Sequence, residues 1–292
     1  MSVANLSSSP TPTPTPTPTP SAADRRVVFR SRGRSHGYIT RLMSPGDIGE
    51  VLKPFVFLDL FDNRGDTFPT FGLHPHSGLA TLTYVAEGSV SYEDTNGATG
   101  VLRAGGVEWM RAGKGVWHAG GAGDPGLTRG FQLWIALPPH LELGESESLY
   151  QSAADIPQVG PARVLLGEFG GAANAIAPPS DITYLAVTLK AGETWRYDPP
   201  AGHTALWLAV GKGAVAVPDV LDHGEIVVFD RAPGGISFTA KGDAEFVIGS
   251  AVPHPHPLAL GYYSVHTSAE ALEAGEARIE EIREGLAAKG RL

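Results

Sequence analysis

Two short stretches of sequence decide the fold, LHPHSG at residues 73–78 and AGKGVWH at residues 112–118. Each lies within or beside residues typical of β-strands, and together they carry three imidazoles, His74, His76 and His118. Side chains alternate between the two faces of a strand, so we expect His74 and His76 to project to the same side, about 7 Å apart along the chain. This spacing suits two ligands of one metal ion.

The sequence between the two stretches predicts a short β-meander. Residues 79–88, LATLTYVAEG, are rich in branched and aromatic side chains and predict a buried strand. The Asn96-Gly97 pair is a hairpin signal, because both central residues of a tight turn between strands need positive φ. A further strand over residues 107–111 then leads to the turn that carries His118. The meander thus returns the third histidine to the first two.

Two histidines on one strand, a glycine turn, a meander and a returning histidine resemble the cupin pattern, a small β-barrel with a metal at its mouth. The residues of the motifs themselves are similar to those of the pirin family in particular. The matching stretches are HPHSG at residues 74–78, GVEWM at 106–110, RAGKGVWH at 111–118 and FQLWI at 131–135. The resemblance covers roughly residues 27–268.

This resemblance implies a bicupin, in which a single iron is held in the N-terminal barrel by three histidines and one glutamate. Some pirins show quercetin 2,3-dioxygenase activity, and others are regulatory partners of transcription or signalling proteins. Carried over to this chain, the pattern assigns the metal to His74, His76 and His118. We therefore expect an all-β fold of two tandem cupin-type antiparallel β-barrels with a short C-terminal helix.

The chain departs from the pirin pattern at both of its carboxylate positions. The family glutamate lies two residues beyond the third histidine, where this chain has Gly120, and a second commonly lies four residues after the histidine pair, at Ala80 here. Three imidazoles can still hold a divalent ion, but no anionic ligand offsets its charge. We expect weaker binding, with Fe(II) as the first expectation and zinc, nickel or no metal as alternatives. Glu108 and Asp124 are candidate substitutes.

Composition narrows the class of protein. A chain of 292 residues predicts about two domains, and the lack of cysteine removes disulfides and thiolate ligands. A formal charge of -9 argues against direct nucleic-acid binding, because neutralising phosphates requires a positive surface. The sequence has no stretch of about 20 apolar residues that would span a membrane, and no secretory signal. We expect a cytoplasmic protein, with a monomer preferred over an oligomer.

Changes in composition divide the chain into four segments. Residues 1–24 form a Thr-Pro-rich leader that we expect to be extended and disordered. Residues 25–140 hold the metal motifs, and residues 141–266 show strand signals about ten residues apart, which predict a second barrel. That barrel is predicted to lack a metal, because His203 has no second histidine beside it. Residues 267–292 open on a capping box and predict a docking helix.

Two functions are compatible with this pattern. The first is a metal-dependent dioxygenase that opens a flavonol-like aromatic small molecule. Because Gly120 also removes the expected general base, its substrate would arrive deprotonated or lose its proton to metal-bound hydroxide. The alternative is a non-catalytic regulator with a degenerate or empty metal site that presents a surface to a partner protein. Its candidate contacts around the mouth are Glu108, Arg111, Lys114 and Trp117.

Overall fold

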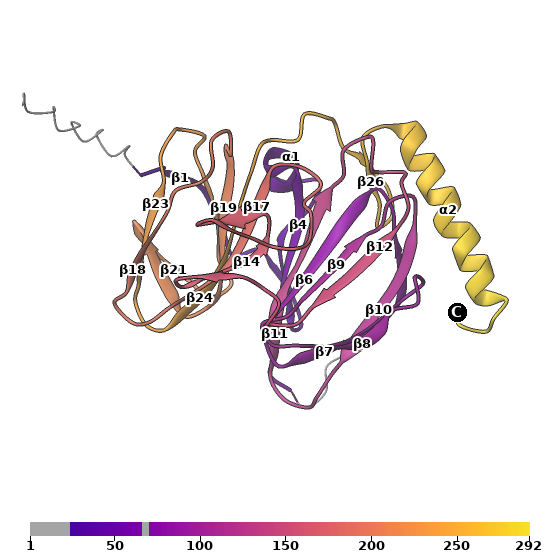
Figure 1. Ribbon diagram of the computed structural model, residues 1–292, viewed down its shortest axis with the longest axis horizontal. Coiled ribbons are helices and arrows are strands. Elements are labelled where there is room, and N and C mark those ends of the chain that lie inside the picture. Colours follow the sequence, from indigo (N-terminus) through magenta and orange to yellow (C-terminus); the bar gives the residue numbers. More distant parts are fainter. Residues whose placement is uncertain (1–23, 66–69) are drawn as a thin grey trace, which may run out of the picture.

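The computed structural model describes residues 24–65 and 70–292, so the predicted leader lies outside the described residues except for Asp24. Two systems of antiparallel sheets stand side by side, and one long helix, α2 (Ala269–Ala287), runs along the outer face of the first (Figure 1). A single helical turn, α1 (Ile48–Leu52), is the other helix of these residues, and neither could span a membrane. The predicted all-β bicupin fold with a C-terminal helix is confirmed.

The first system consists of a seven-stranded and a four-stranded sheet. Its strands are β2 (Arg34–His36), β3 (Ile39–Met43), β4 (Phe55–Asn63), β5 (Phe71–His76), β6 (Leu79–Glu87), β7 (Ser89–Asp94), β8 (Thr99–Arg103), β9 (Val107–Arg111), β10 (Val116–Ala122), β11 (Thr128–Ala136) and β12 (Glu147–Gln151). The larger sheet has the order β12-β9-β6-β11-β4-β3-β2, and the smaller has the order β5-β10-β7-β8. The strands of the predicted meander therefore form, but the meander itself is wrong, because β6 pairs with β9 in one sheet while β7 pairs with β8 and β10 in the facing sheet.

The second system repeats this plan. Its strands are β1 (Val27–Ser31), β13 (Gln158–Val159), β14 (Ala162–Leu166), β17 (Ile182–Leu189), β18 (Thr194–Tyr197), β19 (Ala205–Lys212), β20 (Ala214–Val217), β21 (Asp219–Asp222), β22 (Ile226–Phe229), β23 (Ile236–Ala240) and β24 (Ala244–Ala251). They form sheets in the orders β1-β22-β19-β24-β17-β14-β13 and β18-β23-β20-β21. Two short ribbons, β15 (Glu168–Phe169) with β16 (Ala172–Ala173) and β25 (Ala259–Leu260) with β26 (Val265–His266), complete the strands.

The predicted segments place two strands in the wrong sheet system. Strand β1, within predicted segment 25–140, pairs with β22, where the Arg30 guanidinium donates to the buried carboxylate of Glu225 at 2.7 Å. Strand β12, within predicted segment 141–266, pairs with β9 and covers that edge of the first system. Both exchanges join residues far apart in the chain, which the local pattern of a strand does not encode. The division at residues 140 and 141 itself stays a prediction.

The two systems share an apolar core where they meet, beside a core within the second system alone, and strand β4 shows how the shared core is built. Its alternate residues Phe57, Asp59 and Phe61 line a cavity inside the first system. The residues between them, Leu58 and Leu60, point the other way, into a cluster that also contains core residues of the second system. A strand with both faces covered needs no polar alternation, which explains the apolar run FVFLDLF.

The shared core predicts that the two systems unfold together. Trp207 of β19 is fully buried, and its ring meets that of Phe55 from β4 edge-to-face at a centroid distance of 5.4 Å. Trp207→Ala is expected to lower the free energy of unfolding by about 3–5 kcal/mol, because it leaves a cavity in this core. Guanidinium titration followed by fluorescence and circular dichroism should show one shifted transition. Val220→Ala, at an exposed site, is the control, and two separate transitions with only one shifted would contradict the shared core.

Candidate metal centre

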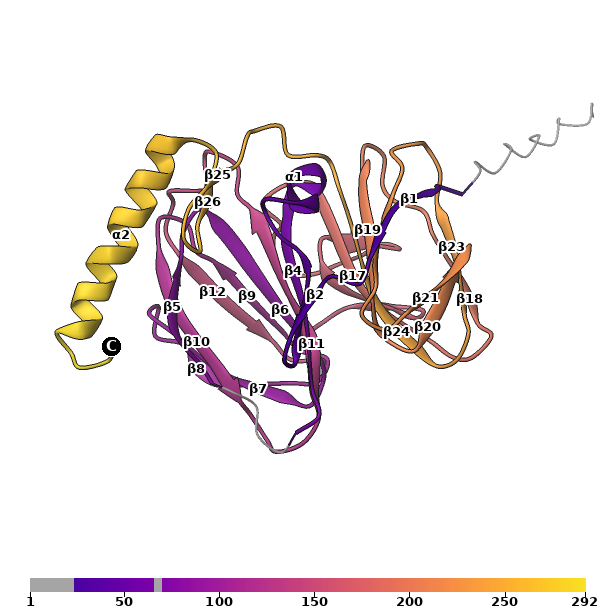
Figure 2. The ribbon, with the colours of Figure 1, turned by 180° about the vertical axis from the view of Figure 1, so that it is seen from behind.

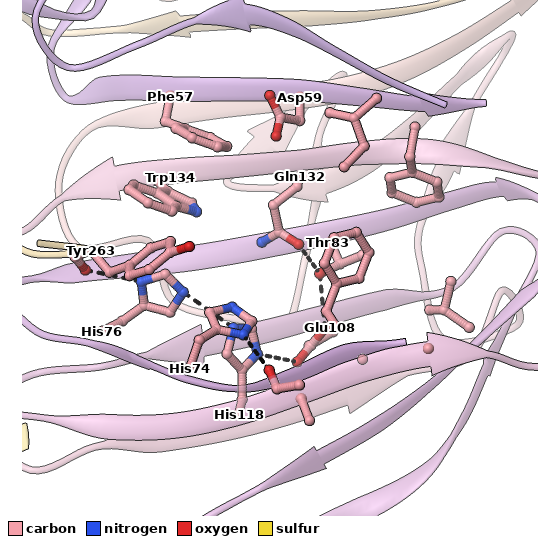
Figure 3. A pocket seen from close by; sticks show the side chains of 18 of the residues that line it. Phe57, Asp59, His74, His76, Thr83, Glu108, His118, Gln132, Trp134 and Tyr263 are labelled. Carbon is pink, nitrogen blue, oxygen red and sulfur yellow. Dashed lines mark hydrogen bonds and ion pairs between the residues drawn. The ribbon is translucent and has the colours of Figure 1, made fainter. Parts of the chain in front are cut away.

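The pairing of strands β5 and β10 brings the three predicted histidines together. The two strands are antiparallel, and His118 lies directly opposite His74 in their register. His76 follows two residues along β5, so its ring projects from the same face. The turn after it needs glycine, because Gly78 has φ +73° and a Cβ there would lie 2.1 Å from the Val265 carbonyl oxygen. Local alternation and one strand pairing thus assemble the cluster, as Figure 3 shows.

The three imidazoles are close enough to share one ion. The Nε2 atoms of His76 and His118 lie 3.2 Å apart, and the ring centroids of His74 and His118 lie 4.3 Å apart. One ring nitrogen from each histidine falls within 4.8 Å of the other two. Burial lowers the pKa of His74 to about 4 and holds the pKa of His76 well below its usual range, and the neighbouring His118 adds to both shifts. The neutral imidazole is the form that binds metal.

Hydrogen bonds fix which nitrogen carries the proton in two of the three rings. The Nδ1 atom of His74 lies 2.9 Å from the Gly72 carbonyl oxygen, and that of His76 lies 3.0 Å from the Tyr263 carbonyl oxygen. Because a carbonyl oxygen only accepts, both Nδ1 atoms carry the proton and donate it. Their Nε2 atoms therefore carry lone pairs, that of His76 facing Nε2 of His118 at 3.2 Å, and this donor set fits a divalent transition-metal ion.

The histidines line a cavity of about 340 Å³ inside the first system. Five aromatic side chains line its walls besides the histidines, and the rings of two of them, Phe57 and Trp134, stack at a centroid distance of 4.0 Å. At one end the Arg41 guanidinium lies 3.9 Å from the centre of the Phe57 ring and pairs with Asp59, with Nη2 3.1 Å from Oδ2. Burial raises the pKa of the Asp59 carboxyl, and the Arg41 guanidinium opposes that shift. The cavity thus combines aromatic surface with a few polar side chains.

The two candidate substitutes for the missing glutamate lie in different places. Gly120 forms part of the cavity wall, and Ala80 is buried in the core. Asp124 does not line the cavity and pairs with Arg103. Glu108 does line it, with Oε1 3.6 Å from Nδ1 of His118. Glu108 thus lies on the Nδ1 side of His118. Among the described residues, the group whose ligand atoms all lie within 4.8 Å of one another consists of the three histidines and does not include Glu108.

The predicted contacts for a partner around the mouth need correction. Glu108 is 5% exposed and faces the interior. Trp117 is covered by helix α2, where its indole nitrogen donates to the Ile279 carbonyl oxygen at 2.9 Å. Arg111 pairs with Glu147 on the neighbouring strand, and Lys114 is the exposed member of the set. The sequence did not reveal that the C-terminal helix occupies this face, because that contact joins residues 162 positions apart.

Tyr263 is the site residue that sequence reasoning missed. It lies between β25 and β26, lines the cavity with its ring, and orients His76 through its carbonyl oxygen. Its φ of 59° is unusual for a residue with a side chain and turns the backbone at this place. The contact spans 187 residues, so neither periodicity nor a local motif could have found it.

A buried polar cluster clamps the same C-terminal segment to the histidine strand. Oγ of Ser77 lies 3.0 Å from Nε2 of His266, whose Nδ1 lies 3.1 Å from Oε2 of Glu142. The order of residues is that of a hydrolase triad, but Ser77 is 0% exposed and does not line the cavity. Helix α2 closes over it, since a Cβ on Gly275 would lie 2.4 Å from the His266 ring. The cluster is therefore structural.

The fold and this cavity define a cupin-type protein with a three-histidine candidate metal centre. The Pirin family profile matches residues 38–135. A pirin-like protein of Caulobacter vibrioides is 35% identical over 191 residues, which are 61% of this chain and 68% of that protein. A Pseudomonas aeruginosa protein with a provisional quercetin 2,3-dioxygenase name is 30% identical over 241 residues, covering 77% of this chain and 83% of that protein. The chain belongs to the pirin family.

Solved structures agree with this assignment. A quercetin 2,3-dioxygenase from Acinetobacter baumannii superposes with a TM-score of 0.81 at 25% identity, over 90% of this chain and 98% of that one. The bacterial pirin YhhW from Escherichia coli, solved in complex with nickel(II), superposes with a TM-score of 0.61 at 21% identity, over 79% of this chain and 98% of that one. The second likeness concerns the fold alone.

The clamp predicts a stability effect that can be measured. Besides His266, the Glu142 carboxylate accepts from the backbone N–H of Thr267 at 2.7 Å and from its hydroxyl at 2.6 Å. Glu142→Gln is expected to lower the free energy of unfolding by about 1.5–3 kcal/mol, because hydrogen bonds to a buried charge are lost. Chemical denaturation measures it, with Glu281→Gln on the exposed face of α2 as the control. Equal stability of the two variants would show that the clamp contributes nothing.

Proposed function

We propose that this pirin holds one transition-metal ion at His74, His76 and His118 and catalyses oxygen-dependent cleavage of a flavonol-like aromatic ring. The observation that carries the proposal is the cluster itself, in which three imidazoles meet in a cavity that aromatic rings help to line. Its volume of about 340 Å³ falls within the range of small-molecule sites. The relatives with quercetin 2,3-dioxygenase names support the same reaction type.

The residues around the cluster have separable tasks in this reaction. A bound ion supplies Lewis-acid and redox chemistry toward oxygen and the substrate's hydroxyl-ketone edge. The stacked Phe57 and Trp134 rings give this part of the cavity an apolar lining, which excludes water from around a bound aromatic. The Arg41–Asp59 pair at the other end of the cavity offers hydrogen bonds to ring hydroxyls. Iron is the proposed resident ion, and nickel and zinc are the alternatives.

Proton removal from the substrate is the weaker part of this arrangement. The family position for a carboxylate on the cavity wall is Gly120, which has no side chain to act as a base. Asp59 is engaged with Arg41, and Glu108 lies behind His118. We therefore propose that the substrate binds as its enolate, and an ion held by the three histidines would stabilise that negative charge.

A second candidate function is a regulator that does not turn over substrate. The same observation favours it, since Gly120 leaves the cavity wall without the family carboxylate. In this account the ion, if bound, sets the shape of the first system, and a partner protein reads its surface. The residues of the cavity do not identify that partner.

Oxygen consumption separates the two functions. Metal-free protein would be loaded with Fe(II), Ni(II) or Zn(II) in separate samples and mixed with quercetin in an oxygen electrode. We expect uptake with one of the redox-active ions and a fall to background in His76→Ala, because two imidazoles hold the ion poorly. His140→Ala, at an exposed histidine outside the cavity, should behave as the wild type. Fully loaded protein that consumes no oxygen with any ion would favour the regulator.

A further inference from the structure

We propose that Glu108 is a positioning residue of the metal centre, and that its carboxylate supplies from behind His118 the negative charge that Gly120 cannot supply as a ligand. This inference rests on the proposed metal binding. It assigns Glu108 a place against the back of an imidazole, and not among the atoms that touch the ion.

A nearby positive charge would stabilise the buried carboxylate of Glu108. Its side chain is buried, and no lysine or arginine of residues 24–65 or 70–292 pairs with it. A second buried carboxylate, Asp94, lies opposite His118 in the register of β7 with β10 and accepts from the Tyr150 hydroxyl at 2.9 Å. Burying an uncompensated carboxylate is unfavourable. A divalent ion on the far side of His118 would offset this charge.

The orientation of His118 matches this role. Its Nε2 faces Nε2 of His76 at 3.2 Å, and its Nδ1 faces the Glu108 carboxylate at 3.6 Å (Figure 3). The longer distance exceeds that of a hydrogen bond, so the contact in this structure is electrostatic. A carboxylate there favours the tautomer with the proton on Nδ1, which leaves Nε2 free. All three imidazoles then direct a lone pair from the same nitrogen, and an oxygen stands behind each ring.

A hydrogen-bonded relay holds the carboxylate in place. The hydroxyl of Thr83 has one hydrogen but faces two oxygens, Oε2 of Glu108 and Oε1 of Gln132, each at 2.8 Å. Meanwhile Nε2 of Gln132 is buried without a partner. Turning the Gln132 amide by 180° resolves both problems, because Nε2 then donates to Thr83 and Thr83 donates to Glu108. In that arrangement Oε2 of Glu108 accepts from the Thr83 hydroxyl, and its Oε1 remains for His118.

The test compares metal affinity with stability in the same variants. Glu108→Gln keeps the size of the side chain and one oxygen that can accept from Thr83, and it removes the charge. We expect about 10- to 100-fold weaker Zn(II) binding by chelator competition, as for other carboxylates behind a metal-bound histidine. We also expect the metal-free variant to be as stable as the wild type or more stable, because a buried charge is gone. A purely structural role would lower both quantities together.

Two further variants make the test specific. Asp124→Asn, at the carboxylate that pairs with Arg103 on the surface, is the matched control and should bind Zn(II) as the wild type does. Gly120→Glu in the Glu108→Gln background should restore affinity, since a Cβ at Gly120 meets only the Ser91 carbonyl oxygen, at 3.6 Å. The visible spectrum of the Co(II)-loaded protein should shift in Glu108→Gln. In Asp124→Asn it should be the same as in the wild type.

The outcomes distinguish this inference from the proposed function. Wild-type protein that binds Zn(II) beside a Glu108→Gln variant of equal affinity would overturn the role of Glu108 and leave the metal site standing. A double variant as weak as Glu108→Gln alone would contradict charge compensation. Wild-type protein that binds neither Zn(II) nor Co(II) would overturn the proposed function, and the inference with it.

Discussion

The antiparallel pairing of β5 with β10 is the constraint on which the site depends. It sets His118 opposite His74, and the period of the strand adds His76 on the same face. A slip of one residue in this register would turn one strand's histidines to the opposite face. The close approach of Gly78 to the Val265 carbonyl oxygen, together with the Ser77–His266–Glu142 clamp, ties the end of β5 to the C-terminal segment. The register of two short strands is thus supported by residues from the far end of the chain.

That C-terminal segment makes the candidate centre a product of the whole chain. After the second system is complete, the chain returns past the first system and ends in helix α2 along its outer face (Figure 2). On the way, the Tyr263 carbonyl oxygen orients His76, and α2 covers Trp117. The segment that leads into the predicted docking helix therefore affects the candidate metal centre, since the Tyr263 carbonyl oxygen sets the tautomer of His76. Its N-cap is Ser268, whose hydroxyl accepts from the Ala271 N–H, one residue beyond the start of the predicted capping box.

The sequence predicted the family, the all-β fold and the three histidines, because each of these depends on local spacing or on a motif. His74 and His76 are two residues apart, and His118 follows a run of short strands whose turns are marked by glycine. The roles of Tyr263 and Glu108 could not be predicted, because they depend on which face of which sheet meets the cavity. The same reason explains the exchange of β1 and β12 between the systems, since an edge strand carries no local mark of its partner. Long-range packing therefore decided everything around the histidines except the histidines themselves.

The central claim is that one transition-metal ion binds to the three imidazoles through their Nε2 atoms. The most direct measurement is metal content by plasma mass spectrometry on protein purified without an affinity tag, followed by X-ray absorption at the edge of the metal found. The account predicts close to one ion per chain, with a spectrum of three imidazoles at about 2.0–2.2 Å and oxygen donors for the rest. Protein that holds no metal and takes up no added Fe(II), or a bound ion without imidazole ligands, would contradict it.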